Sequence, residues 1–210
     1  LSRQTFGDFS VIVVDDGSEP PITSSARLVR QPHGGAPIAR NTGAAATDSE
    51  FLLFLDADAM LTPTALEQMR ATLAAHPEAS YAYGGFRFGW KKFSSFPFDA
   101  DRLRRMPYIH TSALIRRAHF PGFDPALKRF QDWDLWLTML EQGHAGVHVP
   151  EVLYTIANTK GTMSRWIPSF MHRLPWKTAR VRTYDAAMAV IRQKHRLSSD
   201  SSPSSSGTRS

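Results

Sequence analysis

Two apolar runs that each end in acidic residues constrain this chain most strongly. The run Val-Ile-Val-Val leads into Asp15 and Asp16, and the run Phe-Leu-Leu-Phe-Leu leads into Asp56 and Asp58. Unbroken apolar runs of this length are typical of strands buried on both faces of a parallel sheet. Because ligands of open α/β sheets bind outside the carboxyl ends of the strands, we expect both acidic pairs to face one crevice.

The rest of the chain alternates further strand and helix patterns. We expect strands at residues 27–29, 81–90, 108–115 and 147–154, and helices at residues 38–46, 63–73, 131–142 and 177–196. Strands that alternate with helices predict an α/β fold with a mainly parallel sheet flanked by helices, followed here by a C-terminal helical extension.

Length and composition exclude several classes of protein. A chain of 210 residues has room for one sizeable domain, and a hydrophobic content of 42% excludes a fibrous or wholly disordered protein. The absence of Cys excludes disulfide scaffolds, thiolate zinc sites and cysteine nucleophiles. No apolar run is long enough to span a bilayer. The chain begins at Leu1 without an initiator Met or a signal-peptide pattern, so we expect a fragment.

The charge is divided unevenly along the chain. Residues 1–86 hold 5 Lys/Arg against 10 Asp/Glu, whereas residues 87–210 hold 20 against 9. Much of the basic excess flanks the helix at 177–196, whose apolar stripe includes Tyr184, Met188 and Ile191. This basic amphipathic helix predicts contact with an anionic membrane surface, and the alternative is that the stripe packs onto the rest of the chain. The Ser-rich tail after residue 197 predicts disorder.

The acidic clusters have both a chemical and a structural interpretation. Asp56 and Asp58 suit a hard cation, which carboxylate oxygens hold on one side while the phosphates of a ligand complete its coordination. A third cluster, Gln131 to Asp134, contains a candidate general base in Asp132. The structural alternative is that these residues form turns and stabilise helix N-termini, where Asp is common.

Taken together, these motifs closely resemble the family 2 glycosyltransferases over roughly residues 4–164. The blocks stand in the family's order: residues 4–18 with Asp15-Asp16-Gly17-Ser18, residues 34–43 with Gly34-Gly35-Ala36-Pro37 and Arg40-Asn41, residues 54–58 with Asp56-Ala57-Asp58, residues 122–137 with Gly122-Phe123-Asp124 and Gln131-Asp132-Trp133-Asp134, and residues 149–154. Several blocks in the correct order are far more specific than any single motif.

The resemblance implies a GT-A fold and an inverting transfer of a sugar from a nucleotide-sugar, with UDP-sugar as the expected donor class. It implies Mn²⁺ or Mg²⁺ as cofactor. The implied roles are contact with the nucleotide base for Asp16, help in holding the donor for Arg40, proximity to the ribose and metal for Asp56, ligation of the metal for Asp58 and general base for Asp132. The acceptor is expected to be a carbohydrate or a lipid-linked sugar, with Trp90, Trp133 and Asp134 as candidate contacts.

The resemblance also implies an organisation. Residues 1–165 form the transferase domain, with a donor half at 1–86 and an acceptor half at 87–165, followed by the helical extension at 166–197 and the tail at 198–210. We expect a cytoplasmic protein with peripheral contact at the inner face of the membrane. The chain departs from the family in three respects: the first strand precedes Leu1, Gln131 replaces the usual Glu, and residues 158–160 lack a His found in many relatives.

Other function classes explain less of the sequence. A phosphatase of the haloacid dehalogenase type needs Thr or Val two residues after the second Asp, where this chain has Met60. A lone nucleotide-binding or response-regulator module does not explain the Asp132 block. Nucleic acid is not an expected partner, because no recognised fold or basic–aromatic platform accompanies the charge. A non-catalytic relative that binds a sugar nucleotide stays open as the alternative.

Overall fold

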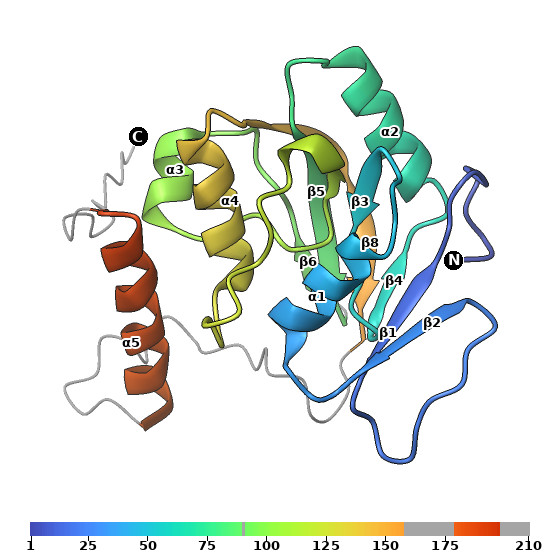
Figure 1. The fold of residues 1–210 in the computed structure, drawn as a ribbon. Coiled ribbons are helices and arrows are strands. Elements are labelled where there is room, and N and C mark those ends of the chain that lie inside the picture. The colour runs from blue at the N-terminus through green and yellow to red at the C-terminus, as the bar shows by residue number, and fades with distance from the viewer. Residues whose placement is uncertain (90, 158–178, 198–210) are drawn as a thin grey trace.

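The computed structural model describes residues 1–89, 91–157 and 179–197 and contains two sheets (Figure 1). Strands β1 and β2 form a small parallel sheet, and a six-stranded sheet has the order β3-β7-β5-β8-β4, with β6 paired to β5. The strands are β1 (Ile12–Asp16), β2 (Arg27–Gln31), β3 (Phe51–Leu53), β4 (Ala59–Leu61), β5 (Tyr81–Phe88), β6 (Lys91–Phe93), β7 (Leu114–Arg116) and β8 (Gly146–Ile156).

Helices flank these sheets, as the sequence predicts. They are α1 (Ala36–Ala45), α2 (Ala65–Ala75), α3 (Ala100–Arg105), α4 (Gln131–Glu141) and α5 (Ala179–Lys194), with a 3₁₀ turn η1 (Arg117–His119). In Figure 1, α3, α4 and α5 gather on one side of the molecule, and α2 lies at the other. The α/β architecture is therefore confirmed.

The strand directions differ from the expected mainly parallel sheet. Among the described strands, only β1–β2 and β5–β8 pair in parallel, whereas β3–β7, β5–β7, β4–β8 and β5–β6 are antiparallel. An apolar run predicts a strand but carries no information about the direction of its neighbours. The β5–β6 connection is only two residues long, and such a short link can join only antiparallel strands.

The six-stranded sheet separates two apolar cores. Side chains alternate across β5, so Tyr81 and Tyr83 enter one core while Ala82 enters the other. The first core lies against α3, α4 and α5 and includes Trp136, which stacks on Tyr81 at 4.4 Å between ring centroids. The second core lies against α2. The loops that carry the candidate site are thus supported from both faces.

Most predicted elements shift by a few residues at their ends, and two of these differences have a clear cause. The strand expected at 108–115 is reduced to β7, because the backbone before it turns and the Ala113 amide donates to the Thr111 carbonyl at 2.8 Å. The helix expected from residue 63 begins at Ala65 instead. The Thr62 hydroxyl donates to the Leu153 carbonyl at 3.1 Å, so this side chain is bound to β8, and Thr64 is the residue that precedes the helix.

Helix α5 packs on the domain through the apolar stripe seen in the sequence. Ile191 is fully buried in the first core and Met188 packs against it, while the Tyr184 ring meets Phe130 edge-on at 4.9 Å. The packing alternative for this stripe is therefore the one observed. Within the described ranges, no helix combines the length and the apolarity needed to cross a membrane.

Candidate functional site

Asp16 lies at the carboxyl end of β1 and holds the glycine-rich turn that follows β2. Its carboxylate accepts hydrogen bonds from the Gly34 and Gly35 amides at 2.8 and 2.7 Å and from the Gln31 side chain at 2.7 Å. Burial raises the pKa of Asp16, but these hydrogen bonds and the nearby His33 outweigh it and bring the pKa below its ordinary value. Asp16 is therefore a fixed anion at the edge of the sheet.

The adjacent Asp15 has a structural environment instead. Its carboxylate is 1% exposed and accepts two hydrogen bonds from Arg30, at 2.9 and 3.0 Å, and one from the Ser18 amide at 3.0 Å. The hydrogen bonds from Ser18, followed by those from Arg30, lower the pKa of Asp15 to about 2. Because Asp15 is buried and its oxygens are bound by Arg30 and Ser18, it ties β1 to β2 and is not available to a ligand, whereas Asp16 stays partly exposed.

Arg40 of α1 joins the loop that carries Asp56 to the start of α4. Its guanidinium donates to Asp56 Oδ1 at 2.7 Å and to Gln131 Oε1 at 2.8 Å, and it lies over the Phe123 ring at 5.2 Å. Gln131 thus keeps a hydrogen bond at the position where the family usually has Glu. One side chain connects the loop after β3 with the start of α4, which are far apart in the sequence.

Asn41, the next residue of α1, holds the segment before α4 in place. Its side-chain amide donates to the Phe123 carbonyl and accepts from the Phe123 amide, both at 2.8 Å. The Asn41 side chain thus binds both backbone groups of one residue, as a neighbouring strand would. These contacts fix the chain next to Gly122, where φ is 93°. Sequence reasoning assigned no role to Asn41, since its partner is a backbone that the sequence does not reveal.

Asp132 lies in the first turn of α4, as the sequence predicts. Phe130 precedes the helix in the left-handed region, with a φ of 56°, and its carbonyl accepts from the Asp134 amide at 2.9 Å. The Asp132 carboxylate accepts from the Trp133 amide at 2.9 Å and stays partly exposed. The position therefore combines a fixed backbone with a carboxylate that a ligand can reach.

His110 is a site residue that the sequence did not reveal. Burial lowers the pKa of His110, the charges of Asp132, Asp56 and Asp58 raise it, Arg40 lowers it, and the net pKa is below the ordinary value. The charged groups that act on this one ring are therefore four of the predicted site residues. His110 follows Ile109, whose carbonyl accepts from the Trp136 indole N–H of α4 at 3.0 Å, and its ring packs on Tyr154 of β8.

The candidate metal ligands lie in the same arrangement. Across residues 1–89, 91–157 and 179–197, no three His, Cys, Asp or Glu side chains form a metal-binding group. Asp56 and Asp58 supply carboxylate oxygens, which fit a hard cation only if the phosphates of a ligand complete its coordination. Asp56 already binds Arg40, which leaves Asp58 as the better ligand.

The acceptor candidates are not brought into this region. Trp133 is fully buried and its indole N–H donates to the Leu103 carbonyl at 2.7 Å. Asp134 is 3% exposed and is bound by Lys194 and His195. The prediction that these two side chains contact the acceptor is therefore wrong for this structure, because both face the core side of α4. Trp90 lies outside the described residues, as do residues 158–160 and the tail at 198–210.

Lys194, the last residue of α5, and His195 attach this helix to α4 through a polar network. Lys194 binds Asp134 at 2.7 Å and Asp124 at 2.6 Å. His195 lies between Asp134, at 2.8 Å, and Glu141, at 2.9 Å. Burial lowers the pKa of His195, but its bonds to the two carboxylates outweigh burial and raise the pKa above its ordinary value. The network holds the helix that carries Asp132.

Comparison with known proteins places this arrangement in a family. The family model described as Glycosyl transferase family 2 matches residues 1–123. A PGL/p-HBAD biosynthesis glycosyltransferase of Mycobacterium tuberculosis is 28% identical over 203 residues, covering 85% of this chain and 77% of that protein. The O-antigen biosynthesis protein RfbC of Myxococcus xanthus is 28% identical over 177 residues, covering 73% of this chain but 14% of that protein.

Solved structures share the fold at low identity. TarS 1-349 of S. aureus in complex with UDP matches with a TM-score of 0.62 and 15% identity, over 94% of this chain and 66% of that one. The mannosyltransferase PcManGT from Pyrobaculum calidifontis, in complex with GDP-Man and Mn²⁺, matches with a TM-score of 0.54 and 16% identity, over 92% and 64%. This chain thus spans slightly less than two thirds of either structure. The chain belongs to glycosyl transferase family 2 and is a glycosyltransferase with the GT-A fold.

Proposed function

We propose that this chain transfers a sugar from a nucleotide-diphosphate sugar to an acceptor hydroxyl with inversion, using Asp132 as the general base. The observation that supports it best is the Arg40 bridge, which binds Asp56 on the donor side and Gln131 on the base side. A single displacement needs the leaving group and the base on opposite sides of one carbon. Arg40 keeps the two carboxylate segments at a fixed separation.

In the proposed reaction, Asp132 accepts the proton of the acceptor hydroxyl while its oxygen forms a bond to the anomeric carbon. The bond from that carbon to the diphosphate oxygen breaks, and the nucleoside diphosphate leaves with the electron pair. Asp58, together with Asp56, would hold a divalent cation, which supplies Lewis-acid stabilisation of the diphosphate when bound. Asp16 would contact the nucleotide base at the other end of the donor.

Mn²⁺ and a UDP-sugar are the cofactor and donor that we propose first. One TarS structure is a complex with UDP-GlcNAc, and the PcManGT structure is a complex with GDP-Man and Mn²⁺. The names of the relatives refer to PGL/p-HBAD and O-antigen biosynthesis, which supports a glycolipid or polysaccharide acceptor. Residues 1–86 would serve the donor and residues 87–165 the acceptor, with 166–197 as an extension.

The donor proposal is tested by calorimetry with UDP, GDP, dTDP and ADP, each with and without Mn²⁺. Metal-dependent binding of one nucleotide supports the donor site and names the base. Asp132→Asn should bind that nucleotide normally but transfer no sugar from the corresponding nucleotide-sugar. Binding without transfer by the unaltered chain, over a broad set of acceptors, would instead favour the alternative of a non-catalytic relative.

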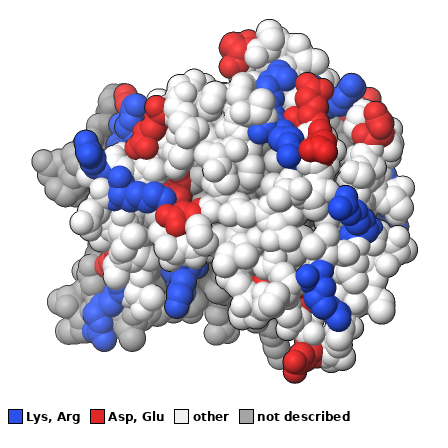
Figure 2. Space-filling model, in the orientation of Figure 1, with Lys and Arg blue, Asp and Glu red and all other residues white. Residues whose placement is uncertain are grey.

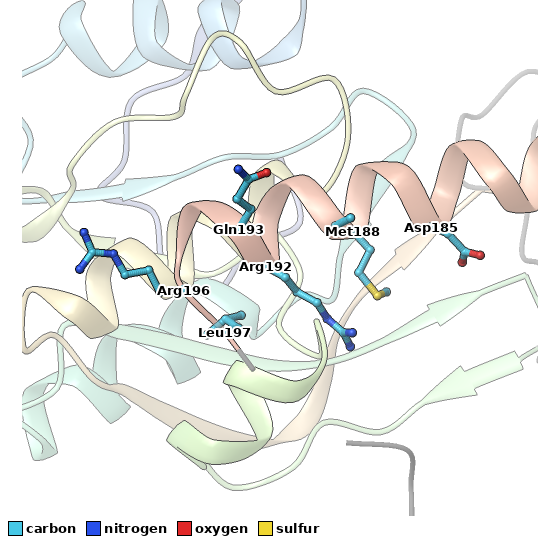
Figure 3. A pocket seen from close by; sticks show the side chains of 7 residues that line it. Asp185, Met188, Arg192, Gln193, Arg196 and Leu197 are labelled. Atoms are coloured by element: carbon cyan, nitrogen blue, oxygen red, sulfur yellow. The ribbon is translucent and has the colours of Figure 1, made fainter. Parts of the chain in front are cut away.

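Peripheral membrane contact through α5 is a further part of the proposal. A hollow of about 670 Å³ runs along α5, and its described lining places Arg192 and Arg196 beside Met188 and Leu197 (Figure 3). Two cations beside apolar side chains suit an anionic lipid headgroup. The face drawn in Figure 2 carries Lys and Arg in several separate groups rather than in one continuous basic patch.

Vesicle co-sedimentation of the full chain tests this contact. The variant carrying both Arg192→Gln and Arg196→Gln should bind less to phosphatidylglycerol vesicles than the unaltered chain, and neither should bind phosphatidylcholine. Arg104→Gln, on the surface of α3, is the matched control. Equal binding by the double variant and the control would contradict a role for α5 at the membrane.

A further inference from the structure

The ring of His110 is held in one orientation by the aromatic side chains beneath it. Its centroid lies 5.5 Å from that of Phe86 and 5.3 Å from that of Tyr154, at interplanar angles of 40° and 39°. Phe86 and Tyr154 themselves stack at 5.5 Å and are nearly parallel. These rings come from β5 and β8, the paired strands at the centre of the larger sheet, so His110 rests on a rigid base.

The hydrogen bond to one ring nitrogen determines where the other carries its proton. The Ser112 amide donates to Nδ1 of His110 at 3.3 Å, so Nδ1 acts as an acceptor. A neutral imidazole that accepts at Nδ1 carries its hydrogen on Nε2 and donates from there. Among the described residues, no hydrogen bond is found to His110 Nε2. The ring therefore presents a fixed, neutral donor that no described partner uses.

The surroundings of this ring identify the part of the ligand that it would meet. The Ile109 carbonyl accepts from the Trp136 indole N–H at 3.0 Å, which places His110 beside α4, one turn after Asp132, assigned above to the acceptor hydroxyl. The His110 ring also packs on Tyr154 of β8, and just past the end of that strand the Ala157 amide donates to the carbonyl of Asp58, assigned to the diphosphate end of the donor, at 2.9 Å. In a single displacement, the group between those two ends is the transferred sugar. A neutral N–H donor matches a sugar hydroxyl or ring oxygen, whereas the diphosphate calls for cations.

We propose that His110 is a specificity-determining residue whose Nε2–H donates a hydrogen bond to an oxygen of the transferred sugar. This inference rests on the proposed function, because it requires a nucleotide-sugar in the site. The contact would orient the anomeric carbon between the departing diphosphate and Asp132. It should strengthen binding of the whole nucleotide-sugar and leave binding of the bare nucleotide unchanged.

Calorimetry in the presence of Mn²⁺ tests this difference directly. The probes are UDP with UDP-glucose, UDP-galactose and UDP-GlcNAc, and GDP with GDP-mannose. His110→Phe keeps the ring packing and removes the donor. It should lower the affinity for the nucleotide-sugar that the unaltered chain binds best by about three- to tenfold, which is the net effect of one neutral hydrogen bond. The affinity for the corresponding nucleotide should not change.

Three further variants keep the inference falsifiable if His110→Phe folds poorly. His110→Asn keeps an acceptor for the Ser112 amide but does not extend to the Nε2 position, so it should lose the same affinity. His110→Gln extends a donor toward that position and should recover most of it. His148→Phe is the matched control, since His148 lies on β8, packs on Tyr83 at 5.7 Å and binds Ser95.

The outcomes separate this inference from the function on which it rests. If the unaltered chain binds no nucleotide, the proposed function fails and the role of His110 fails with it. If the nucleotides bind but no nucleotide-sugar binds more tightly than its nucleotide, the donor site stands and the contact from His110 is overturned. Equal loss of nucleotide and nucleotide-sugar binding in His110→Asn would also overturn it.

Discussion

Asp16 and Asp134 are both held anions, but their partners come from very different places in the chain. Asp16 is bound by Gln31, Gly34 and Gly35, which follow it within the next β-strand and turn. Asp134 is bound by Lys194 and His195, about sixty residues away. The turn beside Asp16 is thus organised by local contacts, whereas the helix that carries Asp132 is held by the docking of α5.

This difference indicates which residues are proposed to act on a ligand and which hold the structure around them. Near β1, Asp16 is both the residue that holds the glycine turn and a proposed ligand contact. On the base side, Asp132 remains accessible because Asp134, two residues later, takes the structural contacts. Variants that break each half in turn test this division, from the largest expected effect to the smallest.

The largest effect is expected from Asp132→Asn. The amide cannot take the acceptor proton, so the rate of transfer should fall by about 10²- to 10⁴-fold, while nucleotide binding stays as in the unaltered chain. Steady-state kinetics with a nucleotide-sugar, together with calorimetry, measures both quantities. Normal transfer by this variant would refute the assignment of Asp132 as base.

Removing the bridge between the halves should cost stability. Arg40→Met leaves Asp56 and Gln131 without their shared partner, and we expect the free energy of unfolding to fall by about 1–3 kcal/mol in urea denaturation. The control is Arg104→Met, which breaks an exposed ion pair with Asp101 at 2.8 Å. That change should lower the free energy of unfolding by about 0.5 kcal/mol or less. Equal losses of stability in the two variants would show that the Arg40 bridge contributes no more than an exposed ion pair.

The glycine turn under Asp16 should be sensitive to its backbone conformation. Gly35 has a φ of 91°, and a Cβ there would meet only the Pro37 ring, at 3.9 Å, so the cost of Gly35→Ala comes from the backbone rather than from crowding. We expect about 1–2 kcal/mol of destabilisation and weaker nucleotide binding, because the Gly35 amide also holds Asp16. Gly7→Ala has open space at an ordinary φ and should change neither quantity.

The smallest effect is expected from the pH dependence of the α5 network. The pKa of His195 is raised in the folded chain, so its stabilising contribution is complete below the ordinary value of 6.5 and is lost as the pH rises through the folded value. The groups that face it are Asp134 and Glu141 of α4 and the neighbouring Lys194. His195→Gln should therefore differ from the unaltered chain more at pH 6 than at pH 9 in melting temperature.

His148 serves as a control for that measurement, because its contribution to stability should change with pH in the opposite direction. Burial lowers the pKa of His148, so its contribution is present at high pH and is lost as the pH falls below 6.5. The difference in melting temperature between His148→Gln and the unaltered chain should therefore be smaller at pH 6 than at pH 9. A His195→Gln variant whose melting temperature differs from the unaltered chain by the same amount at every pH would contradict the proposed charge of His195.

Much of the candidate site follows from the sequence, but in separate pieces. The apolar runs predict β1 and β3, and the motifs place Asp16, Asp56 and Asp132 at the ends of elements that do form. The direction of most strand pairs and the burial of Trp133 were not predictable, because both depend on neighbours distant in the chain. His110 was missed for the same reason, since the rings on which it packs, Phe86 and Tyr154, come from strands far from it in the sequence.

The sequence by itself determined which segments are apolar, where acidic residues end the strands, and the family to which these motifs point. These are local properties, set by side chains next to one another in the chain. Only the tertiary structure decided which carboxylates stay available to a ligand. Asp15 is bound by Arg30 and Asp134 by α5, while Asp58 and Asp132 remain within reach. The reason is physical: a buried charge needs a partner, and the fold decides which charges are buried.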